Sequence, residues 1–231
     1  MANPIFCAVD RPDLEGTLEL ARALAPHVGG IKLGLEFFTA QGPRGVAAVA
    51  ELGLPIFLDL KLHDIPNTVA GAVRQVTRLG VAMLTLHAAG GRAMLEAAVA
   101  AAAAAPKRPA LLGVTVLTSL DAGDLVETGV AAPPHEQAVR LGRLAMAAGL
   151  DGLVCSPLEI APLRRALGPG PMIVVPGIRP AESGDDQKRV LAPTDALAAG
   201  ADILVIGRPI TRAPAPATAA AAISRGLRPA A

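Results

Sequence analysis

FLDLKLHDIPNTV, residues 57–69, is the stretch that decides how this sequence folds. Its apolar residues continue a run that begins at residue 55 and favour a buried β-strand over 55–60. Charged residues follow at once, and Pro66 is typical of the first turn of a helix. A strand that leads through charges directly into a helix is one β/α unit of an α/β protein.

The same unit recurs along the whole chain, and no Ser/Gly-rich linker or block of charge divides it. We predict strands at residues 5–10, 30–34, 55–60, 82–87, 110–115, 152–155, 172–175 and 203–206. We predict helices at 13–27, where Asp13 is the N-terminal cap, and at 66–79, 91–105, 134–148, 157–167, 193–199 and 209–225.

Near-continuous apolar strands that alternate with helices indicate a parallel sheet covered by helices. Eight such units in 231 residues predict one α/β domain over residues 1–231, folded as a (β/α)8 TIM barrel. A doubly wound open sheet is the alternative. In a TIM barrel the chemistry lies at the C-terminal ends of the strands, and phosphate commonly binds after strands 7 and 8.

The composition excludes several classes of protein. With 52% hydrophobic and 18% charged residues, the chain can bury a core and is not intrinsically disordered. A net charge of +1 provides no general field for nucleic acid or an anionic membrane. The absence of Trp and Tyr, with only four Phe, argues against a base-stacking surface, so we expect no nucleic-acid partner.

The sequence also indicates a cytoplasmic protein with no membrane association. Its longest run of small apolar residues, 97–105, is too short to span a bilayer and stops at Pro106. No signal-peptide pattern follows Met1. Cys7 and Cys155 lie far apart in apolar runs and fit buried thiols in a reducing compartment.

Ionisable residues gather where the apolar strands stop. Because buried charges are costly unless paired, we expect two Asp and two Lys among them to form an alternating ion network at the barrel mouth, whereas Asp64 lies beyond the strand and can reach elsewhere, such as a partner subunit. On a strand, side chains two residues apart share a face, so Asp59 and Lys61 should lie together. A purely stabilising ion network is the alternative. Members of this group are Asp10, Lys32, Asp59, Lys61, Asp64 and His87.

The loops after strands 7 and 8 predict a phosphate pocket. Gly207 permits close approach of a ligand, Arg208 offers a planar fork for phosphate oxygens, and Pro209 begins a helix. The polar segment 180–190 suits a lid over the phosphate. No HExxH, Walker A, GxGxxG or Cys/His cluster appears, so neither a metal site nor a nucleotide cofactor is expected.

With these residues in view, the chain resembles the orotidine 5′-phosphate decarboxylase family. The resemblance rests on FLDLKLHDIPNTV and on further blocks in the family's order, which together cover nearly the whole chain. These blocks are CAVD at 7–10, IKLG at 31–34, LHAAGG at 86–91, VTVLTS at 114–119, PGIR at 176–179 and VIGR at 205–208.

The resemblance assigns roles to individual residues. It implies that Asp10 and Lys32 hold ribose hydroxyls, that Asp59 and Lys61 flank the reacting carbon, and that Asp64 and Thr68 come from the other subunit of a homodimer. It implies that Lys32, Asp59, Lys61 and Asp64 form a charge chain. The remaining substrate contacts that it implies are Thr118 for the pyrimidine, Arg179 after strand 7, and Gln187, Gly207 and Arg208 for the phosphate.

The implied reaction is decarboxylation of orotidine 5′-phosphate to UMP, without cofactor or metal. Loss of CO2 leaves a carbanion at C6 with no adjacent π system, so the site must stabilise this charge electrostatically. Lys61 can supply the cation and then the proton. Repulsion between Asp59 and the substrate carboxylate is a secondary contribution.

Two alternatives remain at this point. Magnesium-dependent sugar-phosphate decarboxylases and aldolases are similar at the DxKxxD motif, but they carry a metal-binding glutamate where this sequence has Lys32, and an ammonium cannot ligate a cation. A catalytically silent phosphate-binding barrel would lack a member of the charge chain, and all four are present.

Overall fold

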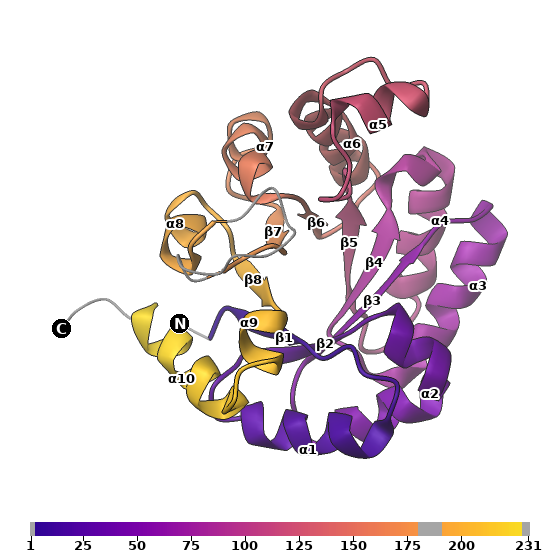
Figure 1. Ribbon diagram of the computed structural model, residues 1–231. Helices are drawn as coiled ribbons and strands as arrows, with labels where there is room; N and C mark the ends of the chain where they lie inside the picture. The colour runs from indigo at the N-terminus through magenta and orange to yellow at the C-terminus, as the bar shows by residue number, and fades with distance from the viewer. Residues whose placement is uncertain (1–2, 180–190, 228–231) are drawn as a thin grey trace.

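In the computed structural model, residues 3–179 and 191–227 are described. Eight parallel strands form a closed barrel in sequence order, and helices surround it (Figure 1). Pairing of β1 with both β2 and β8 closes the barrel, so the (β/α)8 prediction is confirmed and the open sheet is wrong. The strands are β1 (Ile5–Ala8), β2 (Gly30–Leu33), β3 (Ile56–Leu62), β4 (Met83–His87), β5 (Ala110–Val114), β6 (Gly152–Val154), β7 (Met172–Val175) and β8 (Ile203–Ile206).

The helices lie in the connections between the strands and in the segment after β8. They are α1 (Leu14–Leu24), α2 (Leu35–Ala50), α3 (Pro66–Val76), α4 (Arg92–Ala103), α5 (Ala122–Glu127), α6 (Pro134–Ala147), α7 (Ile160–Leu167), α8 (Pro193–Ala198), α9 (Arg208–Thr211) and α10 (Pro216–Gly226). Short 3-10 turns occur at Thr77–Leu79, Ala88–Gly90 and Pro157–Glu159. Asp13 caps α1 as predicted, because its carboxylate accepts from the Gly16 N–H at 2.6 Å.

Three helical segments differ from the sequence prediction. The prediction did not include α2, whose pattern is interrupted where Gly42 leaves helical geometry just before Pro43. It also did not include the short helix α5. The single helix expected at 209–225 is two helices, α9 and α10, with Pro214 in the turn between them and Pro216 at the start of α10.

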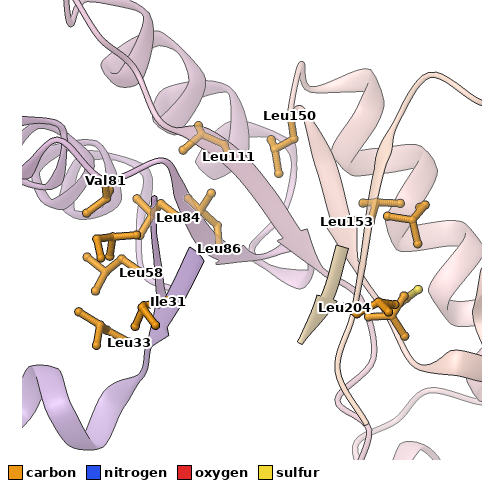
Figure 2. Close-up of a cluster of buried hydrophobic side chains, with 14 of the residues drawn as sticks. Ile31, Leu33, Leu58, Val81, Leu84, Leu86, Leu111, Leu150, Leu153 and Leu204 are labelled. Carbon is orange, nitrogen blue, oxygen red and sulfur yellow. The ribbon is translucent and has the colours of Figure 1, made fainter. Parts of the chain in front are cut away.

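Alternation of side chains along the strands creates two apolar layers. The outer layer packs strand residues against the helices and contains Ile31, Leu58, Leu84 and Leu204 (Figure 2). The inner layer fills the barrel with strand residues only: Phe6, Phe57, Met83, Leu112, Val174 and Val205. The barrel interior is therefore a packed core, which leaves its rim as the place for polar groups.

Strand β3 continues to Leu62, two residues beyond the predicted end, and it contains a bulge. It takes four residue steps from Leu58 to Leu62 while β4 takes only two, from Leu84 to Leu86. We call residues 59–61 the β3 bulge. Lys61, within it, has a φ of 51°, which side chains other than glycine rarely adopt. Bulges of this kind re-aim side chains next to functional sites.

Two carboxylates join neighbouring strands at the opposite end of the barrel. Asp151, just before β6, accepts from the Leu111 N–H of β5 at 2.8 Å and pairs with Arg108. Asp202, just before β8, accepts from the Ile173 N–H of β7 at 2.7 Å and pairs with Arg164. We call these two arrangements the strand clasps.

None of the helices within residues 3–179 and 191–227 is both long and apolar enough to cross a membrane.

Candidate active site

Four charged side chains from three neighbouring β/α units meet at the C-terminal ends of the strands. Lys32 Nζ lies 3.0 Å from Asp10 Oδ2 and 3.5 Å from Asp59 Oδ2. Lys61 Nζ lies 2.9 Å from the same Asp59 oxygen. The sequence predicted that these charges would come together, and the structure brings them into one alternating row. Lys32 is only 8% exposed, so it is not a solvated loop charge.

Asp10 is held by the backbone that follows β2. Its Oδ1 accepts from the Gly34 N–H at 2.7 Å, while Oδ2 faces Lys32. A Cβ at Gly34 would lie 2.3 Å from Asp10 Oδ1, so only glycine leaves room for this contact. Gly34 is thus a supporting residue whose role the sequence pattern did not indicate.

Asp59 stays ionised because its neighbours compensate for its burial. Burial by itself raises the pKa of Asp59, but the charges of Lys32 and Lys61, with hydrogen bonds from Lys61 and Thr85, outweigh it and hold this pKa below its usual value. The site therefore keeps a buried carboxylate charged between two cations.

Thr85 of β4 is a buried contact that the sequence analysis missed. Its hydroxyl donates to Asp59 Oδ1 at 2.9 Å and accepts from the Lys61 N–H at 2.9 Å. Threonine is common in strands, so it does not stand out by type. The available signal was a single polar residue within the apolar run 82–86.

An arginine-rich cavity opens beside the charged row. It has a volume of about 490 Å³ and is lined by residues from the β1, β2, β7 and β8 ends. The lining includes Asp10, Lys32, Arg179, Gly207 and Arg208, five of the predicted site residues. Arg11 and Arg212, which were not predicted, also line it. This concentration of guanidinium groups suits a phosphorylated ligand.

A smaller, mainly apolar pocket of about 150 Å³ adjoins this cavity and shares Lys32, Pro176 and Val205 with it. Its lining includes Asp59, Lys61 and the predicted contact Thr118. A mainly apolar pocket with a few charged lining groups suits a flat ring that carries a reacting anionic group.

Two histidines lie next to the charged row. The rings of His63 and His87 have centroids 5.5 Å apart. Burial lowers the pKa of His87, and the nearby His63 and Lys61 lower it further, while Asp59 acts in the opposite direction. His87 is therefore neutral at neutral pH.

Two of the predicted residues lie outside the charged row of this chain. Asp64 and Thr68 are exposed at the start of α3, and Asp64 Oδ1 accepts from the Ile65 N–H at 2.6 Å. Gln187 and the predicted lid 180–190 lie outside the described residues. Within the described ranges, no three His, Cys, Asp or Glu side chains form a group that could hold a metal ion.

Comparison with known proteins gives a consistent result. Residues 3–223 match the family described as Orotidine 5'-phosphate decarboxylase / HUMPS family. The chain is 55% identical to an orotidine 5'-phosphate decarboxylase from Sphingopyxis alaskensis, over 98% of this chain and 100% of the relative. It is 54% identical to one from Anaeromyxobacter sp. strain K, over 96% and 97% of the two chains.

A solved structure agrees with this result. The orotidine 5'-phosphate decarboxylase structure from Lactobacillus acidophilus has a TM-score of 0.87 and 36% identity to this chain, with 98% of this chain and 99% of that one covered. Sequence and fold point to the same group of proteins over almost the full length. The chain belongs to the orotidine 5'-phosphate decarboxylase / HUMPS family.

Proposed function

We propose that this protein decarboxylates orotidine 5′-phosphate to UMP and CO2, the last step of de novo UMP synthesis. The observation that carries the proposal is the Asp59 carboxylate, shared by Lys61 and Lys32 at 2.9 and 3.5 Å beside an arginine-rich cavity. The relatives at 54–55% identity bear the name of this enzyme, which supports the same activity here.

The substrate would lie across the two adjoining pockets. Its phosphate would occupy the cavity lined by Arg179, Gly207 and Arg208, with Gln187 as a further contact. Asp10 and Lys32, which face each other at 3.0 Å, would hold the ribose hydroxyls. The pyrimidine would then enter the smaller pocket, next to Thr118. This pose brings C6 of the ring toward Asp59 and Lys61.

The Lys61 ammonium would act as the cation and as the acid. When the C6–carboxylate bond breaks, its electron pair stays on C6 and CO2 leaves. The nearby ammonium stabilises this charge and then transfers a proton to C6, which leaves UMP and a neutral amine that regains a proton from water. Asp59, held ionised, would repel the substrate carboxylate until CO2 departs. This repulsion would contribute less to the rate than the stabilisation of the carbanion by Lys61.

We also propose that the active site is shared between two subunits of a homodimer. Asp64 and Thr68 are exposed, and Ile65 between them is 67% exposed, which is unusual for a large apolar side chain. Burial of this segment against a second copy would cover Ile65 and deliver Asp64 and Thr68 to the partner's site.

The proposed reaction needs no metal. Metal-dependent members of the wider superfamily use a glutamate at the position of Lys32, and here the Lys32 ammonium contacts both Asp10 and Asp59. The carboxylates of the row are therefore neutralised by protein cations, and EDTA should have no effect on turnover.

The deciding experiment follows the near-UV absorbance of orotidine 5′-phosphate with the purified protein, with and without EDTA. The absence of Trp and Tyr keeps the protein background low. Conversion to UMP that EDTA does not inhibit supports the proposal. No conversion would contradict it and would direct attention to sugar phosphates with Mg2+.

The shared site has its own test. Lys61→Ala and Asp64→Ala variants, each inactive alone, should recover part of the activity when mixed, because hybrid dimers contain one intact site. No recovery under conditions where subunits exchange would contradict a site built from two chains.

A further inference from the structure

Thr85 stands opposite the β3 bulge and connects its two charged residues. It is completely buried, with 0% of its surface exposed. Because β4 spans the bulge in two residue steps, Thr85 is the one β4 residue between the paired positions Leu84 and Leu86. Its hydroxyl is therefore placed where the regular pairing of the two strands is interrupted.

This hydroxyl uses both of its hydrogen-bonding functions on the charged pair. It accepts from the Lys61 N–H at 2.9 Å, and it donates to Asp59 Oδ1 at 2.9 Å. One side chain thus fixes the backbone of one charged residue and the carboxylate of the other.

The two contacts have different consequences. The bond to Lys61 supports a backbone that has a φ of 51°, a conformation that persists only when its surroundings enforce it. The bond to Asp59 occupies Oδ1 and leaves Oδ2 directed at Lys32 and Lys61, at 3.5 and 2.9 Å. Without the hydroxyl, the carboxylate could rotate and the bulge could relax.

We propose that Thr85 is a positioning residue, which acts on the reaction only through Asp59 and Lys61. This inference rests on the proposed function, because it assumes that these two residues flank the reacting carbon. The inference assigns the role to the hydroxyl rather than to the bulk of the side chain. A serine at position 85 should therefore preserve activity, whereas a valine should not.

The kinetic test compares Thr85→Val with Thr85→Ser. Valine keeps the shape and removes the hydroxyl, so kcat should fall about 10- to 100-fold, as for other residues that orient a catalytic group. The KM for orotidine 5′-phosphate and the Kd for UMP should change less than about threefold, because Thr85 does not line either pocket. Serine should restore kcat to within about threefold of the original.

Thr17→Val is the matched control. Thr17 in α1 is equally buried, at 0% exposed, and its hydroxyl donates one hydrogen bond to the carbonyl of the capping residue Asp13 at 2.8 Å. The same substitution there should leave kcat unchanged. If Thr85→Val does not fold, Thr85→Ala takes its place, since it also removes the hydroxyl.

A second readout does not depend on turnover. In a carbon-13 NMR titration of the Asp carboxyl groups, with Asp59 assigned through Asp59→Asn, the pKa of Asp59 should be higher in Thr85→Val than in the original protein. The Thr85 hydrogen bond helps to hold this pKa down. If the original protein does not decarboxylate the substrate, the proposed function fails, and this titration still shows whether the Thr85 hydroxyl stabilises the ionised Asp59 carboxylate.

Three results would overturn the inference. They are an unchanged kcat in Thr85→Val, a serine variant as slow as the valine variant, and an Asp59 pKa that is the same with and without the hydroxyl.

Discussion

Lys61 Nζ and Asp59 Oδ2 lie 2.9 Å apart, although the two residues belong to one strand whose backbone is bulged between them. The ion pair is therefore a local product of β3. Since Lys61 belongs to neither apolar layer, removal of its side chain takes nothing from the apolar packing of the barrel.

Lys61→Ala should lower kcat by at least about 10³-fold, because in the proposed mechanism Lys61 is both the cation near C6 and the proton donor. The Kd for UMP should change far less. Lys107→Ala, at an exposed position, is the control and should retain full activity. Turnover that survives in Lys61→Ala would contradict the mechanism.

Arg208→Ala should act mainly on affinity. Arg208 lines the arginine-rich cavity, and loss of its proposed charge-assisted contact with phosphate should raise the KM for orotidine 5′-phosphate about 10- to 100-fold. Arg44→Ala, at an exposed position in α2, should have no effect. A variant that lost kcat but kept its KM would argue against a phosphate contact.

Gly34→Ala should displace Asp10 while leaving the fold intact. The new Cβ would lie 2.3 Å from Asp10 Oδ1, the end of a side chain that can rotate away. We expect a rise in KM of about 10-fold, equivalent to one lost hydrogen bond, and little change in Tm. Gly170→Ala, where a Cβ meets nothing within 4 Å, is the control. An unchanged KM would show that Asp10 does not contact the ribose.

His87 should make stability depend on pH. Burial, followed by His63 and Lys61, lowers the pKa of His87 in the folded protein, so the histidine of the unfolded chain binds its proton at a higher pH, about 6.5. The free energy of unfolding should therefore decrease as pH falls from above this value toward the folded-state pKa. Denaturant titrations of His87→Gln should show a weaker decrease, whereas the exposed His135→Gln should behave like the original.

Lys61→Gly should be more stable than Lys61→Ala by about 1 kcal/mol, because alanine at a φ of 51° keeps the backbone strain and glycine removes it. Calorimetry of the two inactive variants provides the comparison. Equal stability would mean that the surrounding contacts, rather than the residue type, fix this conformation.

The sequence predicts the barrel and the charged row well because both depend on simple periodic patterns. Short, mainly apolar segments of three to seven residues form all eight strands, and the charges of Asp10, Lys32, Asp59 and Lys61 stand within or just after the first three. Helix α2 was missed because Gly42 and Pro43 break its pattern, although the chain kinks there and continues as helix.

The support of the site is harder to predict. Thr85 contacts the β3 bulge from the neighbouring strand β4, and neither the bulge nor the register shift leaves a local pattern in the sequence. The role of Gly34 comes from its contact with the Asp10 side chain, which lies 24 residues earlier in the sequence. Such contacts depend on the assembled barrel, which no window of a few residues contains.

The two strand clasps separate contacts that stabilise the barrel from the charged residues of the candidate site, because the two sets lie at opposite ends of the strands. Asp151 and Asp202 use their charges to join neighbouring strands at the N-terminal end, far along the strands from the mouth where Asp59 and Lys61 lie. The strand clasps therefore share no residue with the charged row at the mouth. A designer could replace the loops at the mouth to accept a different phosphorylated substrate and still keep the two strand clasps at the other end.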